Sequence, residues 1–360
     1  MKGRRKPRHC FLPPFVLESI AVHGDEEQRA WAARGMNRDQ SIRLARVENA
    51  KVRARGPREG ADALAVKPTP QPSRNIRDAE GREDVSGDVV RREGDKAAGD
   101  KAADEAYKGL GQTFDFFHEV YDRDSIDDAG MPLRGVVHFG ERYANAFWDG
   151  RRMVFGDGDG KIFQRMTRSL DVIGHELGHG VTEDEAGLEY FGQSGALNES
   201  MSDVFGSMVE QHNKGQTAKQ ADWLIGKEVW TPNVKGDALR SMKAPGSAYD
   251  DPVVGRDPQP AHMKDYVDTT QDNGGVHINS GIPNHAFYTV ATRLGGRTWE
   301  RAGAIWYESL RDPGVQPRSS FRRFAGITLR VAQRLHGTSS EEAMAVYEGW
   351  ENVGVPAPKP

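Results

Sequence analysis

The sequence predicts an α+β fold in which a mixed β/α domain precedes a mostly helical domain, with a small helical module in front of both. Three observations lead to this prediction. After Arg74, glycine-punctuated segments with alternating apolar residues, such as GVVHFG and RRMVFGDGDG, accompany one good helix, DKAADEAYKGLGQTFDFFHEVY. From Ser169 onward, apolar residues recur at helical spacing in one segment after another. Residues 55–74 contain four prolines and few large apolar residues, and they separate the front module from the rest.

The front module reads as helices because Pro14 begins an apolar helical stretch, and Asp25 with Gln28 resembles a capping box before a second one. The proline-rich segment behind it has the composition of a linker exposed to proteases. We expect a helical module at 1–55, a linker at 56–74, an α+β domain at 75–182 and a helical domain at 183–356.

The composition argues against several classes of partner. The 360 residues carry a formal net charge of −4, which gives the whole chain no attraction to nucleic acids or acidic membranes. Segments 1–8 and 41–58 are basic, but no aromatic residues alternate with their arginines, so we expect no nucleic-acid partner. No segment approaches the length of a membrane span, and we expect a monomer without membrane contact. Cys10 is the single cysteine, which excludes an intramolecular disulfide.

The first residues do not match a standard export signal. A basic start is followed by FLPPFVLESIAV, in which Pro13 and Pro14 interrupt the apolar run and Glu18 ends it. A signal peptide has an apolar stretch of about 7–15 residues. We therefore expect the cytoplasm by default, with release by a non-standard route as the alternative.

The segment VIGHELGHGV, residues 172–181, places three ionisable side chains in an apolar run. On a helix, His175 and His179 project from one face, where both imidazoles can bind a single ion. Glu176 lies beside them, close to a water bound by that ion. Zinc lowers the pKa of such a water to about 7, and a neighbouring carboxylate can take its proton. The motif alone is weak, because core or surface histidines also produce it by chance.

A third ligand makes the zinc interpretation more specific. Thr182 and Glu185 stand where the three-histidine form of the motif requires glycine and histidine, which excludes that form. Further along, ALNESMSDVFGSMVE predicts an amphipathic helix whose Glu199 and Asp203 share one face. Glu199 can complete a zinc site of two histidines and a glutamate, and Asp203 can accept the second ring N–H of a liganding histidine. Such a site leaves one coordination position open, which indicates catalysis.

With these residues in place, the chain resembles the thermolysin family of zinc metallopeptidases. Six segments resemble family blocks in the family's order and close to its spacing: NAFWDG, MVFGDGDG, HELGH, GALNESMSD, GDALRSM and DNGGVHINSG. The resemblance extends over residues 75–355, approximately. It implies a two-domain gluzincin fold and a neutral metalloendopeptidase with one catalytic zinc ion and protein or peptide substrates.

The resemblance implies a role for each residue of the zinc site. His175, His179 and Glu199 resemble the zinc ligands, and Glu176 resembles the general base. Asp203 resembles the partner of a zinc histidine.

Other residues resemble the groups that bind the substrate. Tyr190 and His277 resemble the donors that stabilise the oxyanion of the tetrahedral intermediate, with Asp272 orienting His277. Taken singly, Tyr190 could be a packed aromatic residue and His277 a structural turn residue. Three further groups resemble those that hold the substrate's main chain: Asn145, the backbone of Ala146, and Arg240. Taken alone, an arginine could also be a salt-bridge partner.

Six apolar residues fall where the family has the walls of its primed-side pocket. The resemblance therefore implies cleavage on the amino side of large hydrophobic residues, and an apolar pocket distinguishes such residues only weakly. Two other functions remain open: a scaffold or binding protein that keeps the zinc site, and an exopeptidase with the same zinc chemistry. The pocket residues are Phe163, Met166, Val172, Ile225, Val229 and Leu239.

The calcium sites of the family are only partly matched. Asp171, Glu210 and Asp222 resemble carboxylate ligands of its paired calcium site, whereas Leu224 and Lys227 stand where further carboxylates are usual. A lysine beside two divalent cations opposes their binding. We expect the pair to be reduced to one calcium ion or lost.

The short front module resembles a protealysin-type propeptide. It implies an inactive precursor whose own propeptide covers the cleft and is removed by cleavage within 55–74. Cys10 lies shortly before the proline pair, and a thiolate is a good zinc ligand. We hypothesise that Cys10 occupies the open zinc position in the precursor, with a free thiol on a flexible end as the alternative.

Overall fold

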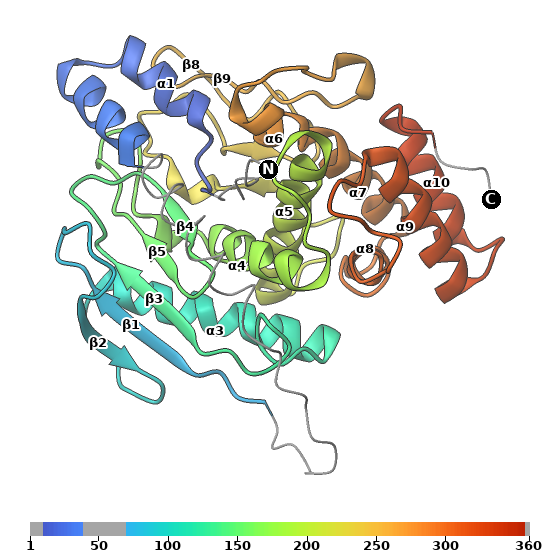
Figure 1. Ribbon diagram of the computed structural model, residues 1–360, viewed down its shortest axis with the longest axis horizontal. Helices are drawn as coiled ribbons and strands as arrows, with labels where there is room; N and C mark the ends of the chain where they lie inside the picture. Colours follow the sequence, from blue (N-terminus) through green and yellow to red (C-terminus); the bar gives the residue numbers. More distant parts are fainter. Residues whose placement is uncertain (1–9, 39–69, 357–360) are drawn as a thin grey trace, which may run out of the picture.

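The computed structural model describes residues 10–38 and 70–356. The expected linker and both basic segments lie mostly or wholly outside these ranges. A mixed sheet with one covering helix forms one side of the molecule, and helices form the other (Figure 1). The predicted α+β architecture with a helical second domain is therefore confirmed. No described helix is both long and apolar enough to cross a bilayer.

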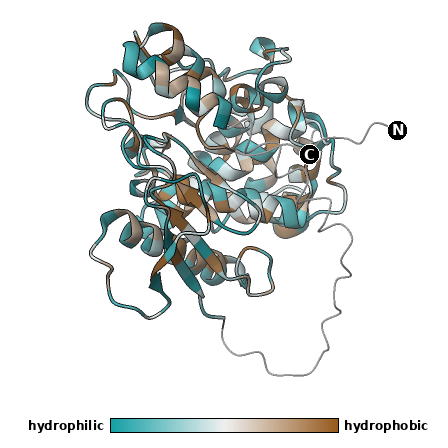
Figure 2. Cartoon of the chain, turned by 60° about the vertical axis from the view of Figure 1, so that its left-hand side comes forward, coloured by the Kyte–Doolittle hydropathy of each residue, from teal (hydrophilic) through white to brown (hydrophobic). Residues whose placement is uncertain are grey.

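The five-stranded sheet has the order β2-β1-β3-β5-β4. The central pairs β1 with β3 and β3 with β5 are parallel, and the two edge pairs are antiparallel. Gly135 of β3 lies against Leu110 and Ala106 of α3, so this helix packs directly on the sheet. Figure 2 shows hydrophobic residues concentrated in the central strands. The bounds are β1 Arg74–Asp78, β2 Asp88–Arg92, α3 Lys101–Tyr121, β3 Leu133–Val137, β4 Ala146–Trp148 and β5 Met153–Phe155.

Two buried helices follow the sheet and cross each other at very short range. These are α4 Leu170–Glu185 and α5 Gly192–Lys214. A Cβ built on Gly174 would lie 3.0 Å from the Cα of Gly206, and a Cβ built on Gly206 would lie 2.4 Å from the carbonyl oxygen of Asp171. The helices therefore meet backbone to backbone, which brings side chains on their facing sides close together.

The remaining elements form short β-ribbons and a helical bundle. In the bundle, α10 packs against α7 and α9, and the indoles of Trp306 and Trp350 stack 6.1 Å apart. The bounds are η1 Met166–Arg168, β6 Leu224–Ile225, η2 Lys227–Val229, β7 Arg240–Ser241, β8 Asp250–Asp251, β9 Gly255–Arg256, η3 Met263–Asp265, α6 Asp272–Asn279, α7 Gly281–Leu294, α8 Ala302–Leu310, α9 Phe321–His336 and α10 Glu341–Asn352.

The helices of the front module lie at the upper left in Figure 1, where α1 (Pro14–His23) is beside β8 and β9. The first helix of the module, α1, begins directly after Pro13, and residues 26–38 form a second helix. The Ser19 hydroxyl of α1 donates to the carbonyl of Val253, 2.9 Å away. In the second helix, the indole of Trp31 packs edge-on against Phe163, with 6.1 Å between the ring centroids. The module is therefore docked on the rest of the chain in this state.

Candidate active site

Helices α4 and α5 bring the three predicted zinc ligands together. His175 and His179 follow each other by one turn on α4, and their ring centroids are 4.7 Å apart. Glu199 faces them from α5, with its carboxylate oxygens 3.5 Å from Nε2 of His175 and 3.4 Å from Nε2 of His179. All three residues are fully buried. The close approach of the two helices therefore builds a compact cluster of two imidazoles and a carboxylate.

The donor atoms of this cluster fit a metal ion. Within the described residues, Nε2 of His175 and Oε2 of Glu199 are buried and make no hydrogen bond. The ligand atoms of His175, Glu176 and His179 lie within 4.8 Å of one another. Buried polar atoms that lack a hydrogen bond are rare, and two imidazole nitrogens with a carboxylate form a common catalytic zinc site. The cluster is a potential metal site.

The outer nitrogen of His175 is fixed by a buried ion pair. Its Nδ1 donates to Oδ1 of Asp203, 2.8 Å away, which leaves the Nε2 lone pair facing the cluster. Arg240 binds both carboxylate oxygens of Asp203, at 2.9 and 2.8 Å, and Asn284 donates to one of them. Burial opposes ionisation of Asp203, but the charge of Arg240 and the hydrogen bond from His175 outweigh it and hold its pKa well below the ordinary value.

The outer nitrogen of His179 has uncharged partners, whereas that of His175 has Asp203. The sequence did not predict these uncharged partners. Nδ1 of His179 lies 2.8 Å from Oδ1 of Asn198 and 2.9 Å from the hydroxyl of Ser202. Asn198 and Ser202 are four residues apart on α5, directly before Glu199 and Asp203. That shared spacing could have identified them. Asn284 reaches the site from α7, and no local pattern marks it.

Glu176 is held at the edge of the sheet. Its side chain is fully buried, and Oε2 accepts a hydrogen bond of 2.8 Å from the backbone N–H of Trp148 in β4. The predicted base is therefore fixed relative to the strand that ends beside the metal cluster.

A left-handed turn positions His277, one of the two predicted oxyanion donors. Asp272, Asn273, Gly274 and Gly275 all have φ between 49° and 83°. After this turn, the Asp272 carboxylate accepts from both the backbone N–H and Nδ1 of His277, at 2.8 and 2.5 Å. Burial alone would lower the pKa of His277, but the charges of Asp272 and Glu199 raise it.

Tyr190 completes this side of the site. Its hydroxyl lies 3.2 Å from Nε2 of His277 and donates to Oε1 of Glu199. Burial, followed by the charge of Glu199, raises the pKa of Tyr190 well above its ordinary value, so the hydroxyl stays protonated. Tyr190, His277 and Glu199 therefore face one point.

Residues 10–12 of the front module lie in this site as a non-helical segment. The backbone N–H of Phe11 donates to the carbonyl of Ala146, 3.1 Å away, and the N–H of Leu12 donates to Oδ1 of Asn145 at 2.9 Å. On the other side, Arg240 donates to the carbonyl of Phe11 over 3.3 Å. All three residues predicted to hold a substrate's main chain thus hold the main chain of residues 11 and 12. The sequence did not predict this register, although an apolar pair before two prolines was visible.

The side chain of Phe11 is fully buried in the site. Its ring packs edge-on against His175, with 5.3 Å between centroids, and lies under the guanidinium of Arg240 at 4.8 Å. A Cβ on Gly226 would lie 2.9 Å from this ring and 3.1 Å from Leu239, so the ring and Leu239 share one pocket. One carbonyl earlier, the oxygen of Cys10 accepts from Nε2 of His277 at 3.1 Å.

All six predicted pocket residues are buried, but they do not all meet the Phe11 ring in the same way. Ile225 and Leu239 are joined by a backbone hydrogen bond of 3.0 Å. Phe163 packs on Trp31 of the front module and on Trp230 instead. The buried set is Phe163, Met166, Val172, Ile225, Val229 and Leu239.

Lysine ammonium groups lie against two of the three predicted calcium ligands. Nζ of Lys227 is 3.0 Å from Asp222, and Nζ of Lys214 is 2.7 Å from Glu210. Asp171 accepts hydrogen bonds from Ser169 and from the backbone N–H of Gly226. These contacts use the carboxylate oxygens that a calcium ion would need.

Two family models match the chain. The model described as the thermolysin metallopeptidase catalytic domain matches residues 68–183, and the one described as its alpha-helical domain matches residues 186–355. The chain belongs to the thermolysin family of metallopeptidases. The predicted family is thus confirmed, and the chain is a thermolysin-family metalloprotease in its precursor form.

Relatives of this family match the chain over almost its full length. An extracellular metalloprotease of Pectobacterium carotovorum subsp. carotovorum is 50% identical over 99% of this chain and 98% of its own length. Protease PrtS of a Photorhabdus strain is 46% identical over 96% of this chain and 91% of its own. The solved precursor of protealysin from Serratia proteamaculans has 47% identity and a TM-score of 0.85, and the match covers 96% of this chain and 99% of that one.

One expectation from the sequence is wrong. The cytoplasm was the default because no standard export signal was found, yet the Pectobacterium relative is named an extracellular metalloprotease. The prolines in the apolar run argue only against a standard signal peptide. They carry no information on other routes of export.

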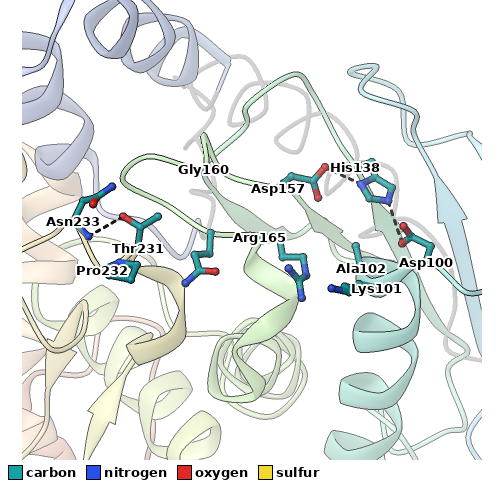
Figure 3. A pocket seen from close by; sticks show the side chains of 11 residues that line it. Asp100, Lys101, Ala102, His138, Asp157, Gly160, Arg165, Thr231, Pro232 and Asn233 are labelled. Carbon is teal, nitrogen blue, oxygen red and sulfur yellow. Dashed lines mark hydrogen bonds and ion pairs between the residues drawn. The ribbon is translucent and has the colours of Figure 1, made fainter.

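A second hollow lies outside this site, between the start of α3 and the segment around Thr231 (Figure 3). It has a volume of about 620 Å³. On one wall His138 lies between two carboxylates, with Nδ1 2.7 Å from Asp157 and Nε2 3.2 Å from Asp100. The pKa of His138 is raised to about 9, and the hydrogen bond to Asp157 is the largest cause of this increase.

Proposed function

We propose that this protein is a zinc-dependent endopeptidase that cuts on the amino side of large hydrophobic residues. The observation that carries the proposal is the buried cluster of His175, His179 and Glu199 beside the carboxylate of Glu176. When bound, zinc supplies a Lewis acid that polarises the substrate carbonyl and lowers the pKa of a water molecule.

The surrounding side chains have separate tasks in this reaction. Glu176 takes the proton of the attacking water and delivers it to the leaving nitrogen. Tyr190 and His277 donate hydrogen bonds to the oxygen on which negative charge develops. Asp272 keeps Nε2 of His277 directed at that oxygen, because it accepts from both the ring and the backbone N–H.

The specificity follows from the pocket that holds Phe11. Asn145, Ala146 and Arg240 align the main chain, and the apolar wall around Leu239 receives the side chain that follows the scissile bond. Burial of a Phe or Leu side chain contributes about 1.5–3 kcal/mol, which favours large apolar residues and separates them only weakly from each other.

The precursor is controlled by its own front module. We infer that residues 1–55 act as an inhibitory propeptide, and that cleavage within 56–74 releases the domains at 75–182 and 183–356. In the docked state the contacts of Phe11 and Leu12 use the groups that a substrate requires. The matured enzyme would act as a monomer outside the cell.

Casein hydrolysis by the matured protein tests the function. We expect hydrolysis that 1,10-phenanthroline removes, that added zinc restores, and that Glu176→Ala lowers by at least a thousandfold. Glu183→Ala, on an exposed turn of the same helix, is the matched control and should keep full activity. Hydrolysis that survives both phenanthroline and Glu176→Ala would contradict the zinc mechanism.

The same material separates the two alternatives. Absence of hydrolysis under every activating condition would favour a scaffold that retains the metal site. Cleavages confined to the ends of an intact protein substrate would favour an exopeptidase. Internal cleavages before Phe, Leu or Ile are the expected result.

A further inference from the structure

We propose that the peptide bond between Cys10 and Phe11 is itself a cleavage site, which the precursor hydrolyses in its own active site. This inference rests on the proposed function and adds a processing site that the composition of residues 56–74 did not indicate. It depends on the direction, the register and the surroundings of the docked segment.

The direction and register are those of a bound substrate. Phe11 and Leu12 use both of their backbone N–H groups toward Ala146 and Asn145, and the Phe11 carbonyl accepts from Arg240. With the Phe11 ring in the apolar pocket, residue 11 takes the place of the residue that follows a scissile bond. The bond that precedes Phe11 is therefore the one presented for hydrolysis.

The carbonyl of that bond lies at the reacting centre. Its oxygen, on Cys10, accepts from Nε2 of His277 at 3.1 Å, and the same nitrogen lies 3.2 Å from the Tyr190 hydroxyl. This is the point at which the site offers its donors to developing negative charge.

One short strand aligns the base with the bond. In β4, the carbonyl of Ala146 accepts from the N–H of Phe11, and the N–H of Trp148 donates to Glu176. Residues two apart on a strand point their backbone groups to the same edge, so β4 places the Glu176 carboxylate beside the nitrogen of Phe11. That nitrogen is the leaving group when the Cys10 carbonyl is attacked.

Cys10 lies near apolar side chains and also near Tyr190, because, besides burial, its charge is one of the causes that raise the pKa of Tyr190. Cys10 is buried and belongs to a cluster on the sheet that includes Val136, Phe147 and Val154. The backbone carbonyl of Cys10, by contrast, contacts His277. The docked segment thus presents a peptide bond to the catalytic groups.

The step is a simple hydrolysis. The oxygen of water bonds to the carbonyl carbon of Cys10, the bond from that carbon to the nitrogen of Phe11 breaks, and one proton passes to this nitrogen through Glu176. The second proton of the water leaves the new carboxyl group for the same nitrogen, so the products are a Cys10 carboxylate and a protonated Phe11 amine. The new end keeps its ring in the pocket and its contacts to Ala146 and Arg240, so the cut shortens the propeptide without releasing it.

Intact-mass analysis of the zinc-loaded precursor tests the proposal. We expect a species that begins at Phe11, formed at a rate independent of protein concentration. Phe11→Ala should slow its formation at least tenfold, Val22→Ala on the exposed side of α1 should not, and Glu176→Ala should abolish it. Cys10→Ser should leave the rate within about twofold of wild type, because the carbonyl is retained.

Failure of this inference is distinguishable from failure of the proposed function. A precursor whose Cys10–Phe11 bond stays intact, while its matured form digests casein, overturns the inference alone. A protein that cleaves neither its own Cys10–Phe11 bond nor casein overturns both the inference and the proposed function. If Phe11→Ala does not fold, a synthetic peptide of residues 8–16 incubated with matured enzyme replaces it, and cleavage elsewhere than before Phe11 contradicts the register.

Alkylation of Cys10 gives a readout that needs no activity. Because the chain has a single cysteine, iodoacetamide labelling of the Glu176→Ala precursor reports directly on the docked segment. We expect slow labelling that Phe11→Ala accelerates at least tenfold and that metal removal leaves within twofold. Acceleration by metal removal as strong as that by Phe11→Ala would show that a thiolate–zinc bond holds the segment, and would overturn the proposal.

Discussion

Arg240 connects two functions that are usually carried by separate residues. Its guanidinium binds Asp203, which fixes the ring of His175, and it also donates to the main chain bound in the cleft. A bound peptide and the metal cluster therefore share one buried cation. A planar group with several donors can make these contacts together, whereas an ammonium cannot.

Arg240→Lys tests this connection. The ammonium keeps the charge but loses the two-pronged contact to Asp203, so we expect kcat/KM to fall about 10- to 100-fold and the free energy of unfolding to fall by about 1–3 kcal/mol. Peptidase kinetics and urea unfolding measure the two effects. Arg318→Lys, in an exposed pair with Glu189, is the control and should change neither. Unchanged kinetics in the Arg240 variant would contradict a role in binding.

His138 predicts a pH-dependent stability that is unrelated to catalysis. Its pKa is raised from 6.5 to about 9 in the folded protein, so the contacts to Asp157 and Asp100 stabilise the fold fully below about pH 6.5. This contribution is lost as the pH rises through about 9. His138→Gln should lower stability by about 1–2 kcal/mol at pH 6 and by almost nothing at pH 10.

Urea unfolding of wild type and variant at several pH values measures this difference. His23→Gln, at the exposed end of α1, is the control and should show the same stability as wild type at each pH. A His138 deficit that persists undiminished at pH 10 would show that packing, not charge, explains it.

For individual residues, the sequence was informative where neighbours on one helix form the site. The spacing of His175 and His179, and of Glu199 and Asp203, placed each pair on one face of its own helix, and the resemblance to the family implied that the two faces meet. Asn284 was beyond reach, because its contact with Asp203 depends on how α7 packs and leaves no periodic signal. The register of Phe11 was equally hidden, since the position of this non-helical segment is fixed by tertiary hydrogen bonds.

The crossing of α4 and α5 sets the dimensions of the metal cluster. Glycines at the contact allow the two backbones to approach closely. A Cβ built on Gly206 would lie 2.4 Å from the carbonyl oxygen of Asp171 and 3.1 Å from the backbone nitrogen of His175. The ligands come from both helices, so any increase in helix separation also moves Glu199 away from the histidines. Periodicity predicted both helices, but no pattern in the sequence gives the distance between them.

Gly206→Ala is therefore expected to damage the metal site through packing alone. The added methyl group has backbone on its contact side and cannot be accommodated by a side-chain rotation. We expect zinc affinity to fall at least tenfold and stability by about 1–3 kcal/mol, measured by zinc titration and by urea unfolding. Gly326→Ala in α9, where the nearest atom is 3.9 Å away, should be neutral or stabilising. Wild-type zinc affinity in the Gly206 variant would refute the argument.

The docked module contacts residues of both predicted domains, Val253 and Phe163. The chain also lacks the full set of carboxylates expected for a pair of calcium ions. Lys227 and Lys214 pair with Asp222 and Glu210, two of the residues predicted as calcium ligands. From the sequence, Lys227 alone was expected to oppose calcium binding; Lys214 was not singled out, and loss of calcium stays a prediction.

The thermal midpoint of the matured protein should therefore be insensitive to EGTA when zinc is kept buffered. Lys227→Asp removes the competing charge, and we expect added calcium to raise its midpoint by several degrees, because an ion that binds only the folded state stabilises it. Lys235→Asp on an exposed loop is the control without a calcium response. A wild-type midpoint that falls in EGTA would show that a calcium site survives.

The start of α1 has a consequence for the proteins that this enzyme can attack. The docked chain passes Leu12 and Pro13 and enters a helix at Pro14, so only these two residues separate Phe11 from the helix. A substrate therefore needs little unfolded length on its carboxyl side. Nicking of native proteins at the frayed start of a helix, rather than digestion of denatured chains alone, is the mode of attack that this geometry permits.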